Sequence, residues 1–186
     1  FYAECGGQIG DSGYIENENL KAEVLTTFKV DKLFVHRAEV INGEITIGET
    51  VKASIDVQKR EEIRLHHTSA HLLQAALIKV LGDEVKQAGS YVDESRMRFD
   101  FTFSRAMTPD EIFKVEEIMN KWVTDAIPVS TEVMDIEKAK LTGATALFGE
   151  KYDDVVRVVS IGKNPCISKE FCAPDRRRSA RWPPDS

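Results

Sequence analysis

Two histidines are spaced four residues apart at the start of a stretch that reads as a helix, residues 64–82, RLHHTSAHLLQAALIKVLG. In a helix, His67 and His71 lie on one face, where both imidazoles can bind one metal ion. Zinc usually takes four ligands, so two imidazoles are an incomplete set. By itself, such a pair is more often structural than metal-binding, so the remaining donors must come from elsewhere in the chain.

The residues around this pair exclude one family of metal sites. Thr68 stands where the zinc-protease motif requires a glutamate base. Thr68 has a second interpretation, because a threonine at the start of a helix can act as its N-cap. His66 has no assigned role, and we expect it to face solvent or to cap the helix.

The apolar pattern around the histidines predicts the helix that positions them. The run QKREEIRLHH, residues 58–67, changes to a helical pattern. Apolar side chains then recur at helical spacing over residues 68–81, and Gly82 suits the end of the helix. Upstream, residues 1–13 contain four glycines and read as a loop. Short β-type runs follow, and Asn42-Gly43 is a strong hairpin signal. Residues 1–58 are therefore expected to form a small antiparallel, β-barrel-like domain.

Residues 59–172 mix helical and strand patterns. The run RMRFDFTF alternates apolar and polar residues, as in a strand with one buried face. Thr108, Pro109 and Glu111 form a capping-box helix start, and that helix is expected to reach about Ala126. Further strands over 127–136 and 154–162, with a short helix between them, complete the pattern. The predicted class is α+β, with an antiparallel sheet and helices packed on one face.

Composition sets limits on the function. The chain has 186 residues, 42% hydrophobic and 30% charged, and a net charge of −6. This charge argues against broad, non-specific nucleic-acid binding and leaves room for a local basic patch. No run of eighteen apolar residues predicts a membrane span, and the N-terminus lacks the features of a signal peptide. The three cysteines predict reduced thiols rather than disulfides.

The two ends of the chain suggest a fragment. It begins with Phe1 instead of a methionine, as expected for a piece of a longer protein. Residues 173–186, APDRRRSARWPPDS, have no periodicity and hold four arginines and three prolines. This composition predicts a disordered or non-native tail.

Six motifs together resemble the editing domain of alanyl-tRNA synthetases and its free-standing relatives. In order along residues 1–172 they are FYAECGGQIGDSG, HHTSAHLLQAAL, VKQAGSYV, RMRFDF, TGATALFGEKYDDVVRVVSIG and SKEFC. The motif ALFGEKY points to the full-length synthetase more than to the free-standing proteins. The resemblance implies a cytoplasmic protein. It also implies that an ATP-using aminoacylation domain would precede this segment and that an oligomerisation domain would follow it.

The resemblance also implies a set of zinc ligands. In the family, the two histidines are completed by Cys-Gly-Gly-Thr-His, so that His67, His71 and Cys172 fall on the first three ligand positions of one zinc ion. The fourth position, 176, holds arginine, which is always protonated and cannot bind zinc. We therefore expect this chain to bind zinc weakly or not at all.

The implied reaction is hydrolysis of the ester in tRNA(Ala) mischarged with serine or glycine. The partner would be this tRNA, with no DNA and no membrane. Thr68 is the candidate for sensing the seryl hydroxyl and Gln87 for positioning substrate or water. Gly6, Gly7 and Gln8 would let backbone approach the substrate, and Arg98 would contact the tRNA end.

Alternative interpretations remain open at this point. The chain could be a non-catalytic tRNA-binding module with the same fold, or a free-standing editing hydrolase. The related editing domain of threonyl-tRNA synthetase shares the histidine and cysteine pattern, but the N-terminal glycine motif and ALFGEKY argue against it. Gln87 could merely satisfy a strand edge, and Cys172 could be an ordinary buried thiol.

Overall fold

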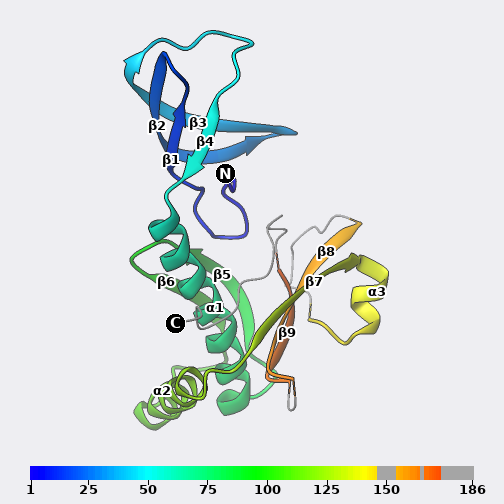
Figure 1. Ribbon diagram of the computed structural model, residues 1–186. Coiled ribbons are helices and arrows are strands. Elements are labelled where there is room, and N and C mark those ends of the chain that lie inside the picture. Colours follow the sequence, from blue (N-terminus) through cyan, green and yellow to red (C-terminus); the bar gives the residue numbers. More distant parts are fainter. Residues whose placement is uncertain (146–153, 164–165, 173–186) are drawn as a thin grey trace. The chain divides into compact units, whose positions relative to one another are not determined.

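The computed structural model describes residues 1–145, 154–163 and 166–172 (Figure 1). The motif ALFGEKY at 146–152 and the tail 173–186, which includes Arg176, lie outside the described residues. The described part contains three helices and antiparallel sheets, so the predicted α+β class is confirmed. The N-terminal strands form an open four-stranded sheet and, within the described residues, no closed barrel.

The chain divides into two compact units. One comprises Phe1–His67 and Tyr91–Arg98, and the other comprises Thr68–Ser90 and Phe99–Ser186. The sequence predicted domains at 1–58 and 59–172, with the tail beyond. The division into units follows contacts rather than chain order, because a segment from the middle of the chain joins the N-terminal unit.

The first unit is built on a four-stranded antiparallel sheet. Its strands, in spatial order, are β3 (Leu33–Gly43), β2 (Leu20–Val30), β1 (Gly13–Glu16) and β4 (Lys52–Ile55). The two long strands are rich in β-branched and aromatic residues, which favour a pleated surface. Leu20, Ala22 and Val24 alternate along β2 and are all buried, so this face of the strand forms the core of the sheet.

The prediction of a hairpin turn at Asn42-Gly43 is wrong, because both residues lie in β3. The strands β2 and β3 pair from Val30 opposite Leu33, so they turn at Asp31-Lys32, and Asp31 has a φ of 53°. Gly43 instead ends β3 opposite Leu20, with a φ of 79°. A Cβ there would lie 1.7 Å from the carbonyl oxygen of Asn19. This glycine is therefore explained by a close backbone approach and not by a turn.

Helix α1 runs from Val57 to Leu81 and begins eleven residues before the predicted apolar stripe. At its start, the side chain of Asp56 accepts a hydrogen bond of 3.0 Å from the backbone N–H of Lys59. Thr68 therefore lies inside the helix, and its interpretation as an N-cap is wrong. Gly82 ends the helix as predicted, with a φ of 95° and its N–H bonded to the carbonyl of Ile78.

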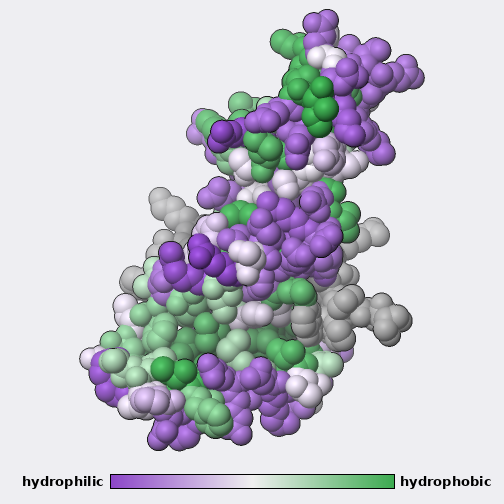
Figure 2. Space-filling view, turned by 90° about the vertical axis from the view of Figure 1, so that its left-hand side faces the viewer, coloured by the Kyte–Doolittle hydropathy of each residue, from purple (hydrophilic) through white to green (hydrophobic). Residues whose placement is uncertain are grey.

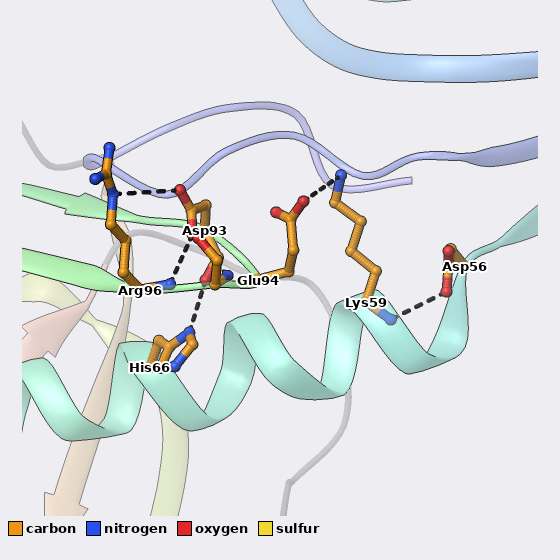
Figure 3. A network of polar contacts seen from close by, with 7 residues as sticks. Asp56, Lys59, His66, Asp93, Glu94 and Arg96 are labelled. Carbon is orange, nitrogen blue, oxygen red and sulfur yellow. Dashed lines mark hydrogen bonds and ion pairs between the residues drawn. The ribbon is translucent and has the colours of Figure 1, made fainter.

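A polar network joins the first half of α1 to the turn between the next two strands (Figure 3). One ring nitrogen of His66 lies 2.8 Å from the backbone oxygen of Asp93, and Lys59 forms an ion pair of 3.3 Å with Glu94. The carboxylate of Asp93 accepts hydrogen bonds from the backbone N–H groups of Ser95 and Arg96. His66 thus holds this turn, where we expected it to face solvent or to cap the helix.

Strands β5 (Lys86–Val92) and β6 (Met97–Thr102) form the predicted hairpin, and α2 runs from Pro109 to Thr124. The capping box of Thr108 and Glu111 is present as predicted. A buried cluster joins α1, the residue before β5 and α2. The three phenylalanines of the alternating run pack against it, which confirms the buried face of that run. The cluster comprises Ala76, Leu77, Val85 and Val115, with Phe99, Phe101 and Phe103.

The last part of the chain forms a three-stranded antiparallel sheet in the order β7 (Val129–Asp135), β8 (Val155–Ile161) and β9 (Ser168–Cys172). The short helix α3 (Ile136–Leu141) follows β7. Leu72 of α1 packs in one buried cluster with Val159, Ile161 and Cys172. On the other side, Val158 and Phe171 join Ala139 of α3 in a second cluster. Strands β8 and β9 therefore have buried residues on both faces, and Cys172 lies on the face that α1 covers.

The surface mixes polar and apolar side chains. Figure 2 shows hydrophobic groups gathered at several places among hydrophilic ones. Exposed large apolar side chains include Leu33, Phe34, Ile41 and Ile47 of the first unit and Phe113 of α2. Exposed apolar side chains are usual on folded proteins, and we assign these no role. Within the described residues, no helix is both long and apolar enough to cross a lipid bilayer.

Candidate metal centre

The structure brings together three of the side chains that the sequence singled out. The ligand atoms of His67, His71 and Cys172 all lie within 4.8 Å of one another. The two histidines are one turn apart on α1, and Cys172 is the last residue of β9. The exposed fractions of His71 and Cys172 are 8% and 3%. The two imidazoles therefore lie close to a buried thiol that is about a hundred residues away in sequence.

The first imidazole is held by the glycine-rich motif. Nδ1 of His67 lies 2.6 Å from Oε1 of Gln8, which is buried. Cys5 and Gln8 exchange two backbone hydrogen bonds, of 3.0 and 3.2 Å, across Gly6 and Gly7. Both glycines have positive φ, 57° and 81°, as a tight two-residue turn of this kind requires. The turn explains both glycines and carries Gln8 to the histidine.

The same turn is fastened to its own unit on two sides. Gly7 accepts a hydrogen bond of 2.8 Å from the N–H of Val92, and Ile9 donates one of 3.1 Å back to the oxygen of Val92. A buried ion pair joins Asp11 to Arg60 of α1, with Nε 2.7 Å from Oδ1. The backbone N–H of Tyr2 donates to the same carboxylate. Gln8 is thus carried on a segment fixed at both ends.

The second imidazole is held by a carboxylate that the sequence analysis missed. Nδ1 of His71 lies 2.5 Å from Oε2 of Glu170, and the exposed fraction of Glu170 is only 5%. The other carboxylate oxygen, Oε1, accepts a hydrogen bond of 2.7 Å from the hydroxyl of Ser168. The sequence did carry a signal, because Ser168, Glu170 and Cys172 alternate along SKEFC and must share one face of a strand.

The electrostatics of the group favour a positive charge at its centre. Burial lowers the pKa of His71, but its hydrogen bonds to Cys172 and Glu170, together with their charges, raise this pKa to about 10. A buried imidazole between two acidic groups is thus stabilised as a cation. A divalent metal ion can supply the same positive charge, and binding it would release the proton.

The residues fit a zinc ion by their chemistry. Thiolate sulfur and imidazole nitrogen are the usual protein ligands of zinc, and three protein ligands leave a position open for water or substrate. With Nδ1 of each imidazole occupied by an oxygen partner, zinc would be bound through Nε2. Hydrogen bonds of this kind orient histidine ligands in known zinc sites. His67, His71 and Cys172 would hold the ion.

The other predicted site residues lie on neighbouring elements. Thr68 follows His67 on α1 and is half-buried, and Gln87 is half-buried on β5. Gly6 and Gly7 are exposed, and Arg98 is exposed on β6. Their predicted roles toward substrate remain predictions. Cys5 and Cys166 are exposed and Cys172 is buried, and none of the three forms a disulfide within the described residues.

Comparison with known proteins gives consistent matches. Residues 1–59 match a family described as tRNA synthetases class II (A). The chain is 49% identical over 172 residues to an alanine–tRNA ligase of Legionella pneumophila (strain Paris). These 172 residues are 92% of this chain and 20% of that protein. Alanine–tRNA ligases of Synechococcus sp. (strain JA-3-3Ab) and Leptospira biflexa match the same share of the chain at 46% and 43% identity, over 19% and 18% of their own lengths. The chain thus spans about a fifth of the length of these relatives.

Proposed function

We propose that this chain is the editing region of an alanine–tRNA ligase and hydrolyses tRNA(Ala) mischarged with serine or glycine. The chain is homologous to one segment of the alanine–tRNA ligases. The observation that carries this proposal is the meeting of His67, His71 and Cys172 within 4.8 Å. The names of the relatives describe the ligation of alanine to tRNA. Because the chain spans about a fifth of them, we propose ligation only for a whole protein that contains this segment. Its proposed place of action is the cytoplasm.

An editing site is needed because alanine is hard to distinguish from its neighbours by size. A pocket that accepts alanine cannot exclude glycine, and it excludes the slightly larger serine poorly. A second site can select serine by hydrogen-bonding its hydroxyl, since alanine would then leave polar groups unpaired. Thr68, half-buried and next to His67, is our candidate for this contact.

The chemical step is ester hydrolysis. Water adds to the ester carbonyl, the bond to the ribose oxygen breaks, and the proton from water ends on that oxygen. Zinc bound by the three ligands would supply Lewis acidity for this step. His71 and Cys172 would hold the reacting centre in a buried place, and Gln87 is our candidate for positioning substrate or water. Arg98 and the backbone of Gly6 and Gly7 are proposed to receive the single-stranded end of the tRNA.

The sequence at position 176 favours a second candidate for this particular chain. Arginine there cannot complete the ligand set that the resemblance implies. The chain could therefore bind tRNA without hydrolysing it. The two candidates differ in what happens when the missing ligands are supplied.

The test compares the chain with a restored variant that carries Ala173→Gly, Pro174→Gly, Asp175→Thr and Arg176→His. Deacylation of Ser-tRNA(Ala) is measured in the presence of zinc. We expect the restored variant to be at least about tenfold faster than the parent chain, because a histidine at position 176 would complete the ligand set that the resemblance implies and would raise the affinity for zinc. His71→Ala in the restored variant should abolish the activity.

Correctly charged Ala-tRNA(Ala) serves as the control substrate and should remain intact. If the parent chain and the restored variant are equally inactive while both bind tRNA, the editing proposal is wrong and the binding-module interpretation holds.

A further inference from the structure

Strand β9 presents three polar side chains on one buried face. Ser168, Glu170 and Cys172 alternate with Lys169 and Phe171, and their exposed fractions are 8%, 5% and 3%. Phe171 packs on the opposite face with Val158 and Ala139. This arrangement buries a carboxylate, which is costly unless its oxygens are hydrogen-bonded. Both oxygens of Glu170 have partners.

These partners define what the carboxylate does. The hydroxyl of Ser168 donates to Oε1 at 2.7 Å, and Nδ1 of His71 meets Oε2 at 2.5 Å. An ionised carboxylate only accepts hydrogen bonds, so the proton of this contact must sit on Nδ1 of His71. The contact therefore keeps a proton on Nδ1, so that Nε2 is the ring nitrogen left for a metal ion, and it fixes the plane of the ring.

The contact between His67 and Gln8 does not determine which atom carries the proton. Gln8 faces His67 through its side-chain amide, which contains both an acceptor and a donor. An amide can rotate to accept from Nδ1 or to donate to it, so it does not specify the tautomer by itself. Only the carboxylate on His71 admits a single arrangement.

We propose that Glu170 is a positioning residue, which holds His71 with Nδ1 protonated and Nε2 directed to the metal, and that Ser168 holds Glu170 in turn. This inference rests on the proposed function, since it assigns a role toward the proposed zinc ion. Neither residue touches the substrate in this assignment.

The first measurement uses the metal-free chain and does not depend on zinc. Nitrogen-15 NMR of the histidine side chains should show a downfield, slowly exchanging proton on Nδ1 of His71. Glu170→Ala should remove this signal, whereas Glu170→Gln should keep it at a less extreme position, because the amide oxygen can still accept. Glu132→Ala, which removes an exposed carboxylate from β7, is the matched control and should leave the signal unchanged.

The second measurement is cobalt(II) binding, followed by the absorption of the thiolate complex. The background is the restored variant, which has the full ligand set implied by the resemblance. In this background we expect Glu170→Ala to weaken cobalt binding by about 10- to 100-fold, the usual effect of losing a hydrogen-bond partner of a ligand. Ser168→Ala should weaken it less, and Glu170→Gln should restore part of the loss.

The outcomes separate this inference from the proposed function. An Nδ1 proton signal that is absent in the parent chain, or unchanged in Glu170→Ala, overturns the positioning role. So does a measurable cobalt affinity of the restored variant that Glu170→Ala leaves unchanged. If the parent chain shows the Nδ1 signal and loses it in Glu170→Ala, and yet the restored variant binds no cobalt, the positioning of His71 holds and the metal site of the proposed function fails.

Discussion

At the scale of single residues, each imidazole of the candidate site depends on a partner distant in sequence. Gln8 and His67 are 59 residues apart, and Glu170 and His71 are 99 residues apart. These contacts form only when the chain has folded. The segment that carries Gln8 is in turn held by one charged pair, Asp11 with Arg60. The contribution of this pair to the free energy of unfolding is therefore the first quantity to test.

Asp11→Asn should lower the free energy of unfolding by about 3–5 kcal/mol, because it leaves the buried guanidinium of Arg60 without its counter-charge. The side chains of the pair are 3% and 6% exposed, so water cannot replace the lost partner. Chemical denaturation of the parent chain and the variant measures the difference.

The control for this prediction is the double variant Asp11→Leu with Arg60→Met. Removing both charges avoids an unpaired buried ion, so the double variant should lose less stability than Asp11→Asn alone. A loss for Asp11→Asn below about 1 kcal/mol, the level of an exposed pair, would contradict the structural role assigned here.

At the scale of elements, the start of α2 combines a cap and an ion pair. Thr108 accepts from the N–H of Glu111, and the carboxylate of Glu111 accepts from the N–H of Thr108. Arg105 also donates to this carboxylate, at 2.6 and 2.8 Å. The hydrogen bond from Arg105, followed by that from the backbone of Thr108, lowers the pKa of Glu111 to about 2.

The sign of the pH dependence follows from this lowered pKa. The unfolded chain takes up a proton near the ordinary value of 4.5, before the folded chain does, so the stabilisation is complete above that pH and is lost as the pH falls toward about 2. Glu111→Gln should therefore be less stable than the parent chain at neutral pH, and the difference should shrink between about pH 4.5 and 2. Thermal unfolding across this range measures it. A difference that is constant with pH would rule out the carboxylate as its source.

The elements also show how far the sequence alone could go. The capping box at Thr108, the helix end at Gly82 and the buried phenylalanine face were predictable, because each depends on residues close together in the chain. The turn at Asp31-Lys32 was missed, since Asn42-Gly43 carried the stronger local signal and only the approach of Asn19 reveals its other purpose. The start of α1 at Val57 was also predictable to within a residue, because the run QKREEIRLHH over residues 58–67 changes to a helical pattern.

The candidate site also contains residues that the sequence could predict and one whose role it could not. His67, His71 and Cys172 could be proposed from a motif, and the structure brings them together. For Glu170 the local sequence gives only the strand face that it shares with Cys172, because one acidic residue in a short strand does not indicate its partner. The partner is set by the packing of β9 against α1, through the cluster of Leu72 and Cys172. Long-range packing is the information that local patterns lack.

At the scale of the whole molecule, the proposed ion would link α1 to the last described strand. Its ligands come from residues about a hundred positions apart, so the unfolded chain cannot present them together. Zinc should therefore stabilise the folded chain by an amount that grows with the logarithm of its concentration relative to its Kd. For a ligand at 100 times its Kd, the gain is about 2.7 kcal/mol.

We expect the restored variant described above to gain this stability from zinc and the parent chain, with Arg176, to gain much less, because arginine adds no ligand. Thermal unfolding with and without zinc measures both gains. His71→Ala in the restored variant should remove the gain, whereas His66→Ala should retain it, since His66 bonds the turn at Asp93 and not the ligand group. An equal gain in the parent chain would mean that three ligands suffice, and a gain that survives His71→Ala would place the ion elsewhere.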